Sequence, residues 1–269
     1  MALMTLKTKI NFVVQRTLMP AQAFLDVFVP PACPLCATVL SGDGGLCAPC
    51  WQALHFIRAP ICDISGAPLD VDLGPQTVSL AMQKNPPPYD KARAAFHYKG
   101  SAAALVKRLK FSDRPELAPL VAPFMVQAGA DVLRAHAILV PVPLHRRRLL
   151  ERRFNQAAEL CRAIARTTGH DIAFQAVHRV KSTRPQIGLT RRNRKRNLKG
   201  AFAVPEAQKD YLKGRTLVLV DDVLTTGATV EAMSETLRRA GAGRIYVLTL
   251  ARVVRPNQMR VPQNPRDTR

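Results

Sequence analysis

The chain has 269 residues, which allows one large domain or two smaller ones. Hydrophobic residues make up 47% of the sequence, so the chain can build a buried core, which excludes a protein that is disordered throughout. The formal net charge of +21 at pH 7 favours an anionic partner, and nucleic acid, a polyphosphate ligand and an acidic protein all remain open.

The first stretch, residues 1–30, is apolar but interrupted by charged and polar residues. No uninterrupted run is long enough to span a bilayer, and no clear small-residue cleavage site follows it. We therefore expect neither a signal peptide nor a membrane span, and we expect a cytoplasmic protein. An amphipathic helix is the better prediction, in which Phe24, Leu25, Val27 and Phe28 pack on the domain that follows.

Four cysteines come next, in two C-x-x-C pairs separated by ten residues: Cys33, Cys36, Cys47 and Cys50. Four thiolates at this spacing are typical of a tetrahedral structural zinc site. Two disulfides or a redox dithiol would use similar pairs. A reducing cytosol argues against disulfides, and no βαβ pattern surrounds either pair to suggest redox chemistry. We therefore favour structural zinc, held in a zinc-ribbon module at residues 31–83.

A third pair of this kind is incomplete, because Cys62 is followed by Ser65 at the second position. We interpret Cys62 as a small buried residue and leave it out of the zinc site. The stiff proline run at residues 84–90 favours an extended spacer, so we place a domain boundary there and a second domain at residues 91–253.

Strands and helices are both predicted in this second domain. Strand patterns cover residues 92–98, 137–143, 174–180, 216–220 and 244–253. Helical patterns cover residues 100–111, 115–134, about 153–168 and 230–238, and the second is interrupted at Pro119 and Pro123. In the helix at 100–111, the basic residues Lys107, Arg108 and Lys110 should point outward. Residues 254–269 are polar with several prolines, and we expect them to be disordered.

Two basic stretches are candidates for holding a polyanion. The first follows the apolar run at 137–143 and comprises His145, Arg146, Arg147 and Arg148, whose charge and arginine forks suit phosphate oxygens. For His145, a role as acid, base or phosphate donor and no role at all are equally open. The second is residues 181–200, and three interpretations remain open for it: a lid over pyrophosphate, a nucleic-acid arm and a solvated loop. It has no interleaved aromatic residues, which weakens the single-strand interpretation.

Residues 216–230, TLVLVDDVLTTGATV, combine three signals in one short run. The β-branched stretch 216–220 suits a strand buried on both faces of a parallel sheet. Asp221 and Asp222 stand where that strand should end, and ligands of open α/β sheets bind beyond the carboxyl ends of strands. A small, hydroxyl-rich loop then leads into a helix.

The loop suits a phosphate, because a helix start presents unpaired N–H groups and a partial positive charge. Its residues are small or carry hydroxyl donors: Thr225, Thr226, Gly227, Ala228 and Thr229. Carboxylates do not bind phosphate directly, so Asp221 and Asp222 are expected to bind sugar hydroxyls and a divalent cation. A plain buried strand, turn and capped helix would leave two adjacent acids in an apolar setting unexplained.

This run resembles the signature of type I phosphoribosyltransferases, in which the acidic pair holds the ribose hydroxyls of phosphoribosyl pyrophosphate and the loop holds its 5′-phosphate. The ordered set of motifs is similar to the ComF family from about residue 28 to residue 250. It comprises the paired cysteines, PVPLHRRR, RRFNQA, TRPQIGLTRRNRKRN, GAF and LVDDVLTTGAT. The resemblance implies an α/β fold with a central parallel sheet flanked by helices, a hood, and an N-terminal double zinc ribbon.

The same resemblance implies a role in DNA uptake during natural transformation, with a DNA-translocation machine as partner. Two departures from the family patterns matter. Ser65 replaces an expected cysteine, so the second ribbon should be degenerate and metal-free. Thr225 stands where purine-using transferases carry an acidic base, which leaves the acceptor undetermined.

Two functions are therefore carried forward. In a Mg²⁺-dependent phosphoribosyltransferase, Asp221 and Asp222 would orient the ribose diol, and the basic stretches at 146–148 and 181–199 would take the pyrophosphate. The alternative is an accessory protein that binds nucleic acid, with single-stranded DNA as a candidate partner, and that keeps the fold without turnover. The first function requires both carboxylates to face the loop, and ion pairs that tie them into the interior would argue against it.

Overall fold

The computed structural model describes residues 30–41, 45–111, 114–145, 149, 152, 154–181 and 198–261. It forms two compact units, residues 1–52 and 53–269. The predicted amphipathic helix at residues 1–30 lies outside the described residues, apart from Pro30. Among the helices that the structure does describe, none is long and apolar enough to cross a membrane.

In the described part of the first unit, tight turns precede helix α2 (Ala48–Gln52). An antiparallel bridge joins Ala32 to Val39 and brings the first cysteine pair into a turn, where the Cys33 N–H donates to the Thr38 carbonyl at 2.8 Å. The Trp51 N–H donates to the Cys47 carbonyl at 2.9 Å.

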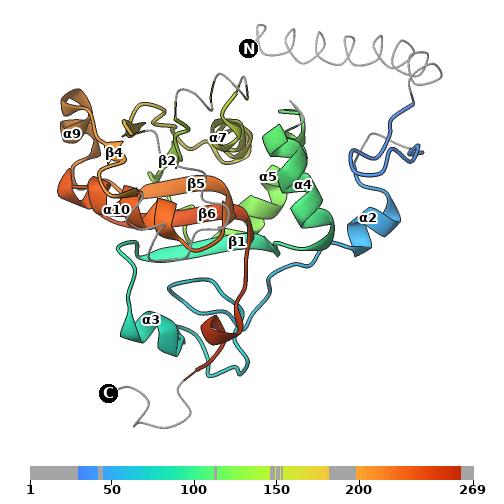
Figure 1. Cartoon of the computed structure of the whole chain (residues 1–269), viewed down its shortest axis with the longest axis horizontal. Coiled ribbons are helices and arrows are strands. Elements are labelled where there is room, and N and C mark those ends of the chain that lie inside the picture. The colour runs from blue at the N-terminus through green and yellow to red at the C-terminus, as the bar shows by residue number, and fades with distance from the viewer. Residues whose placement is uncertain are drawn as a thin grey trace, which may run out of the picture. The chain divides into compact units, whose positions relative to one another are not determined.

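A parallel sheet is the core of the second unit (Figure 1). Its strands are β1 (Lys91–His97), β6 (Ile245–Arg252), β5 (Leu217–Leu224) and β2 (Ile138–Pro141), in that spatial order. All eight residues of β6 and all four of β2 are buried, as expected for strands covered on both faces. Strand predictions at 92–98, 137–143 and 244–253 are confirmed within one or two residues at each end.

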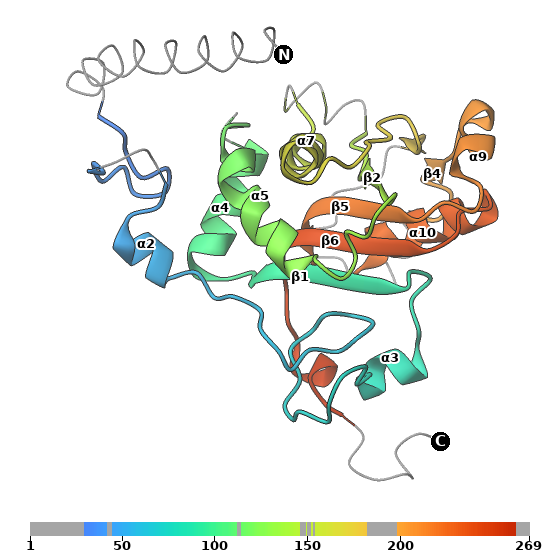
Figure 2. The same ribbon diagram turned by 180° about the vertical axis from the view of Figure 1, so that it is seen from behind.

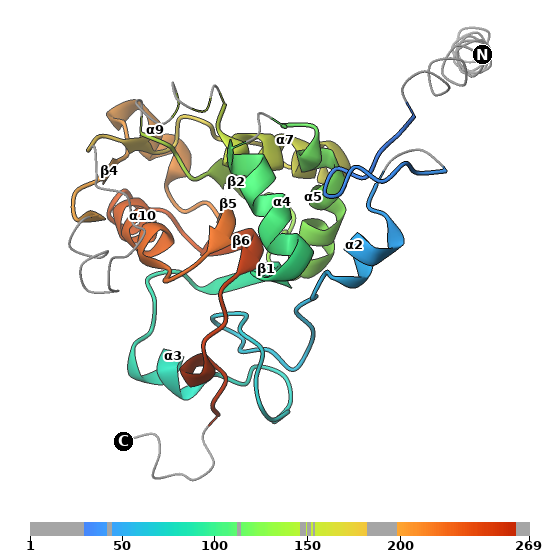
Figure 3. The same cartoon turned by 45° about the vertical axis from the view of Figure 1, so that its right-hand side comes forward.

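Helices cover both faces of this sheet, with α4, α5 and α7 on one side and α10 on the other (Figure 3). Their bounds are α4 (Gly100–Phe111), α5 (Leu117–Ala128), α7 (Gln156–Thr168) and α10 (Ala228–Arg239). The interruption predicted in the second helix was wrong, because α5 runs through Pro123 and buries Val121, Ala122 and Met125 around it. Helix α7 begins at Asn155, whose side-chain oxygen accepts the N–H of Ala157 at 3.0 Å.

A small antiparallel pair, β3 (His178–Arg179) and β4 (Phe202–Ala203), lies near helix α9 (Glu206–Leu212). The strand predicted at 174–180 is therefore reduced to two residues, and Phe174 is exposed. Most of the basic stretch at 181–200 falls outside the described residues, since only residue 181 and residues 198–200 belong to them.

The chain divides into its two compact units between Gln52 and Ala53, inside the segment that we assigned to the zinc-ribbon module. The reason is backbone pairing between the later part of the zinc-ribbon segment and the outer edge of β1. The Ile57 N–H donates to the Ala95 carbonyl at 2.9 Å, and the Ala92 N–H donates to the Ile64 carbonyl at 2.7 Å. This pairing joins residues 53–83 to the sheet domain.

The segment after β6 is ordered as far as Val261, in contrast to the disorder predicted for residues 254–269; residues 262–269 are not described. It forms a short 3-10 helix, η1 (Pro256–Gln258), and lies beside α3 (Leu80–Lys84) (Figure 2). The N–H groups of Asp70 and Leu80 donate to the carbonyls of Met259 and Arg260, both at 3.1 Å. These bonds fasten the end of the described chain onto the segment that precedes the sheet.

Candidate functional site

The acidic pair lies inside strand β5, not at its end as the sequence predicted. The parallel ladder to β6 continues past the pair, from Asp221 opposite Thr249 to Leu224 opposite Arg252. The pattern of apolar residues ends at Val220, but the backbone pairing is indifferent to side-chain polarity, so the strand extends four residues further.

Asp222 is buried, with 2% of its surface exposed, and is held by two partners. Its Oδ1 atom lies 3.0 Å from the Lys110 ammonium, and its Oδ2 atom accepts a hydrogen bond from Gln156 Nε2 at 3.1 Å. A buried carboxylate requires such partners, because leaving water without them is costly. Lys110 therefore points inward, and the prediction that it faces outward with its basic neighbours was wrong.

Asp221 is half-buried, whereas its neighbour Asp222 is buried. Its Oδ1 accepts the Asp222 N–H at 2.9 Å. Burial, and next the charge of Asp222, raise the pKa of Asp221 from 3.8 to about 7, although Lys110 opposes this. The pair therefore carries negative potential that Lys110 only partly compensates, and a divalent cation would relieve it.

The loop after β5 leads directly into the N-terminus of α10. Gly227 is the N-cap in the left-handed region, with φ of +84°, and no side chain caps the helix. An added Cβ there would lie 3.0 Å from Glu231 Oε1, so the position suits glycine. The Thr226 hydroxyl is buried and has no hydrogen-bond partner among the residues that the structure describes. An orphaned donor beside uncapped amides fits a phosphate ligand.

The basic residues predicted to hold pyrophosphate are only partly described. His145 follows β2 and is half-buried, whereas Arg146, Arg147 and Arg148 lie outside the described residues. Sequence reasoning missed Lys110 and Gln156 as partners of the acidic pair. Lys110 follows the apolar Leu109 in the last turn of α4, and the helical spacing of apolar residues alone predicts that its side chain faces solvent.

The four cysteines of the first unit lie together, and their sulfur atoms are within 4.8 Å of one another. Ligation at 2.3 Å to a tetrahedral zinc would place sulfurs about 3.8 Å apart, so a small contraction closes the site. Hydrogen bonds from Thr38 lower the pKa of the Cys36 thiol to about 6, which favours the thiolate that zinc binds. In the part of the chain that the structure describes, no other group of three or more such residues could hold a metal.

The segment around Cys62 lacks the second cysteine that would complete another ribbon, because Ser65 stands at that position. The Cys62 sulfur is fully buried and accepts the N–H groups of Ser65 at 3.5 Å and Ser79 at 3.4 Å. Apolar side chains surround it, including Leu69, Met82 and Val261. These residues do not supply the four soft ligands of a zinc ribbon.

Two family models match this chain. The family model described as a double zinc ribbon domain matches residues 24–79, and the one described as a phosphoribosyl transferase domain matches residues 169–265. The DNA utilization protein YhgH of Salmonella typhi is 34% identical over 232 residues, which cover 84% of this chain and 99% of that protein. Competence protein F of Haemophilus influenzae is 32% identical, with coverage of 77% and 90%. The chain belongs to the ComF family.

Competence protein ComFC of Bacillus subtilis is 25% identical to this ComF protein, over 80% of this chain and 87% of that one. The second unit has a phosphoribosyltransferase-like fold, and the first carries a structural zinc site of the ribbon type. Solved structures match more weakly. A hypoxanthine phosphoribosyltransferase of Trypanosoma cruzi is 15% identical with a TM-score of 0.32, over 58% of this chain and 71% of that chain.

Proposed function

We propose that this ComF protein binds phosphoribosyl pyrophosphate with Mg²⁺ at the carboxyl end of β5, and that it acts in the uptake or use of DNA. One observation supports the first part. The half-buried Asp221, whose pKa is raised, precedes the N-cap of α10 by only six residues, and no side chain caps that helix. The second part is supported by relatives that are named for competence and DNA utilization.

In this proposal each group of the chain has a separate task. The amides at the start of α10 and the Thr226 hydroxyl bind the 5′-phosphate, with Thr225 and Thr229 beside them. Asp221 accepts hydrogen bonds from the ribose hydroxyls, and its charge favours the cationic sugar that forms as pyrophosphate leaves. Asp222 positions Asp221 through its backbone N–H. Mg²⁺, when bound by Asp221 and the ligand, neutralises the leaving group.

The ion pair of Asp222 changes the prediction that both acids contact the ribose. Because Lys110 and Gln156 occupy both of its oxygens, Asp222 is a positioning residue in our proposal, and Asp221 alone contacts the diol. The same ion pair favours the second function, an accessory protein that keeps the site without turnover, since a charge neutralised from within does less to stabilise a cationic sugar.

Calorimetric titration with Mg²⁺–phosphoribosyl pyrophosphate tests the binding proposal. Asp221→Asn should remove most of the affinity, and Thr226→Val should lower it about tenfold, as expected for the loss of one hydrogen bond to a charged group. Thr236→Val is the matched control, because it removes a hydroxyl near the other end of α10 that donates to the Ala232 carbonyl. Unchanged affinity in Asp221→Asn would refute the proposed site.

Turnover and nucleic-acid binding are separated by two further measurements. Release of pyrophosphate by the wild type and not by Asp221→Asn supports the enzyme. Affinity for single-stranded DNA that falls steeply with salt and survives Asp221→Asn supports the accessory protein.

A further inference from the structure

A short extended segment, residues 54–58, covers the outer edge of β1. Phe56 forms an antiparallel bridge with Phe96, and the His97 N–H donates to the His55 carbonyl at 2.8 Å. In an antiparallel pair, residues directly opposite each other project from the same face, and neighbours along a strand alternate.

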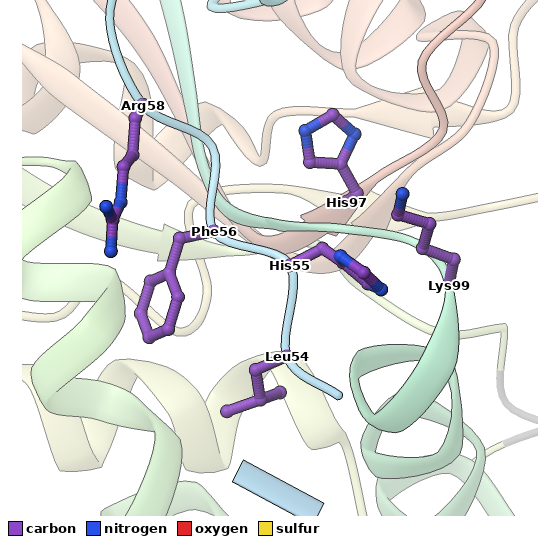
Figure 4. A pocket seen from close by; sticks show the side chains of 6 residues that line it. All are labelled: Leu54, His55, Phe56, Arg58, His97 and Lys99. Carbon is purple, nitrogen blue, oxygen red and sulfur yellow. The ribbon is translucent and has the colours of Figure 1, made fainter. Parts of the chain in front are cut away.

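Alternation separates an aromatic face from a basic face. The rings of Phe56 and Phe96 pack at a centroid distance of 4.8 Å, and both meet Phe124 of α5 at 5.9 and 5.5 Å. His55 and His97, one residue along on each strand, are also cross-strand neighbours but project from the other face. Figure 4 shows the side chains of His55 and Phe56 on opposite sides of the segment.

A pocket of about 290 Å³ lies here, and its lining is formed by Leu54, His55, Phe56, Arg58, His97 and Lys99. His55, His97 and Lys99 lie on one side, and Arg58 lies on the side of Phe56, with its guanidinium carbon 5.8 Å from the ring centroid (Figure 4). Every ionisable group in the lining is basic. Among the described residues, no carboxylate lies within ion-pair distance of any of them.

The positive charges of the pocket act on one another. Burial, and then the charges of Lys99, His55 and Arg252, lower the pKa of His97. Arg252 lies opposite His97 in the β1–β6 register and is buried, so it adds positive charge near His97. An anion that entered would meet attractive charge from several sides and would release this mutual repulsion.

We propose that this pocket binds a phosphate group, through hydrogen bonds from the side chains of His55, His97 and Lys99. Its volume is at the lower limit of small-molecule pockets, which suits a phosphate with one attached sugar better than a larger ligand. His97 lies opposite Arg252 in β6, and Arg252 lies opposite Leu224 in β5. The pocket is therefore at the carboxyl ends of the strands, as is the loop after β5, and is two strand spacings or about 10 Å from it. It is therefore a second site, and it can fail while the proposed function stands.

Two sources could supply this phosphate, a small phosphorylated compound or the backbone of single-stranded nucleic acid. Nitrogen-15 NMR of the histidine rings in the full-length, zinc-loaded protein distinguishes them, since the chain has only six histidines. The probes are inorganic phosphate and an oligo-dT of about ten nucleotides, within the usual range of single-strand sites. The test variant is His55→Gln combined with Lys99→Gln, two exposed residues whose loss should not disturb the fold. Lys107→Gln, an exposed lysine on α4, is the control.

A small-compound site predicts that inorganic phosphate shifts the His55 and His97 ring signals, and that the double variant abolishes the shift at His97 while the control retains it. A nucleic-acid site predicts that only the oligonucleotide shifts the His55 and His97 ring signals. The double variant should then bind the oligonucleotide about fivefold more weakly, and its plot of log affinity against log salt concentration should be less steep by about 0.7 per lost contact. The proposal is overturned if neither probe shifts these two rings, or if the double variant and Lys107→Gln bind both probes equally well.

Discussion

The ionised Asp221 side chain should destabilise the folded protein. We therefore expect Asp221→Asn to make the fold more stable at neutral and alkaline pH. Burial and Asp222 raise the pKa of Asp221 from 3.8 to about 7 in the folded state. Each pKa unit corresponds to about 1.4 kcal/mol, so full ionisation of the folded protein costs at most about 4 kcal/mol. Because the side chain is only half-buried, we expect a gain of about 2–4 kcal/mol in the variant.

The sign of this effect depends on pH in a defined way. Below about pH 4 the carboxyl is protonated in the folded and unfolded states, so wild type and variant should be equally stable. Between pH 4 and pH 7 only the unfolded chain ionises, and the wild type loses stability relative to the variant. Above about pH 7 both states are ionised, and the difference between the two proteins stays constant.

Urea unfolding of both proteins at intervals from pH 5 to pH 8.5 measures this difference. Protonation of the zinc thiolates affects both proteins alike and cancels in the comparison. Asp210→Asn, which changes an exposed aspartate of α9, is the control and should show no pH-dependent gain. If Asp221→Asn is no more stable than the wild type at pH 8, ionisation of Asp221 does not destabilise the folded protein and our reasoning is refuted.

Three further predictions concern metal, charge and packing. The purified protein should contain one zinc per chain by elemental analysis, not two, because Cys62 is surrounded by apolar side chains and not by further soft ligands. Lys110→Met should lower the free energy of unfolding by about 3 kcal/mol by stranding the Asp222 carboxylate, and adding Asp222→Leu should recover much of the loss in a double-mutant cycle. Truncation after Val253 should expose the Cys62 sulfur, so a thiol reagent should modify it at least tenfold faster than in the intact chain.

Much of the architecture follows from local pattern. The strand at 217–220 and the helix at 100–111 were predictable because apolar runs and helical spacing determine them directly. The cysteine spacing likewise predicted the cluster in the first unit. In each case the signal lies within about a dozen residues, so no knowledge of distant partners is needed.

The features that were missed depend on contacts between distant residues. Nothing near Lys110 indicates that its ammonium meets a carboxylate 112 positions later in the chain. The division between Gln52 and Ala53 was not predicted, because the prolines at 84–90 signal stiffness only locally, whereas Ile57 and Ile64, which precede them, pair through their backbone with the edge of β1. The tail was predicted to be disordered because Val261 has few apolar neighbours in sequence, although several surround it in space.

The contacts made by residues 259–261 affect the order in which the protein folds during translation. The cysteines of the first unit are close in sequence, so they can capture their ion soon after they leave the ribosome. The segment around Cys62 differs, because Met259, Arg260 and Val261 complete it and are synthesised some two hundred residues later. During translation this segment must therefore wait, with its apolar side chains uncovered, until the chain is almost finished, and any premature stop leaves it exposed to chaperones and proteases.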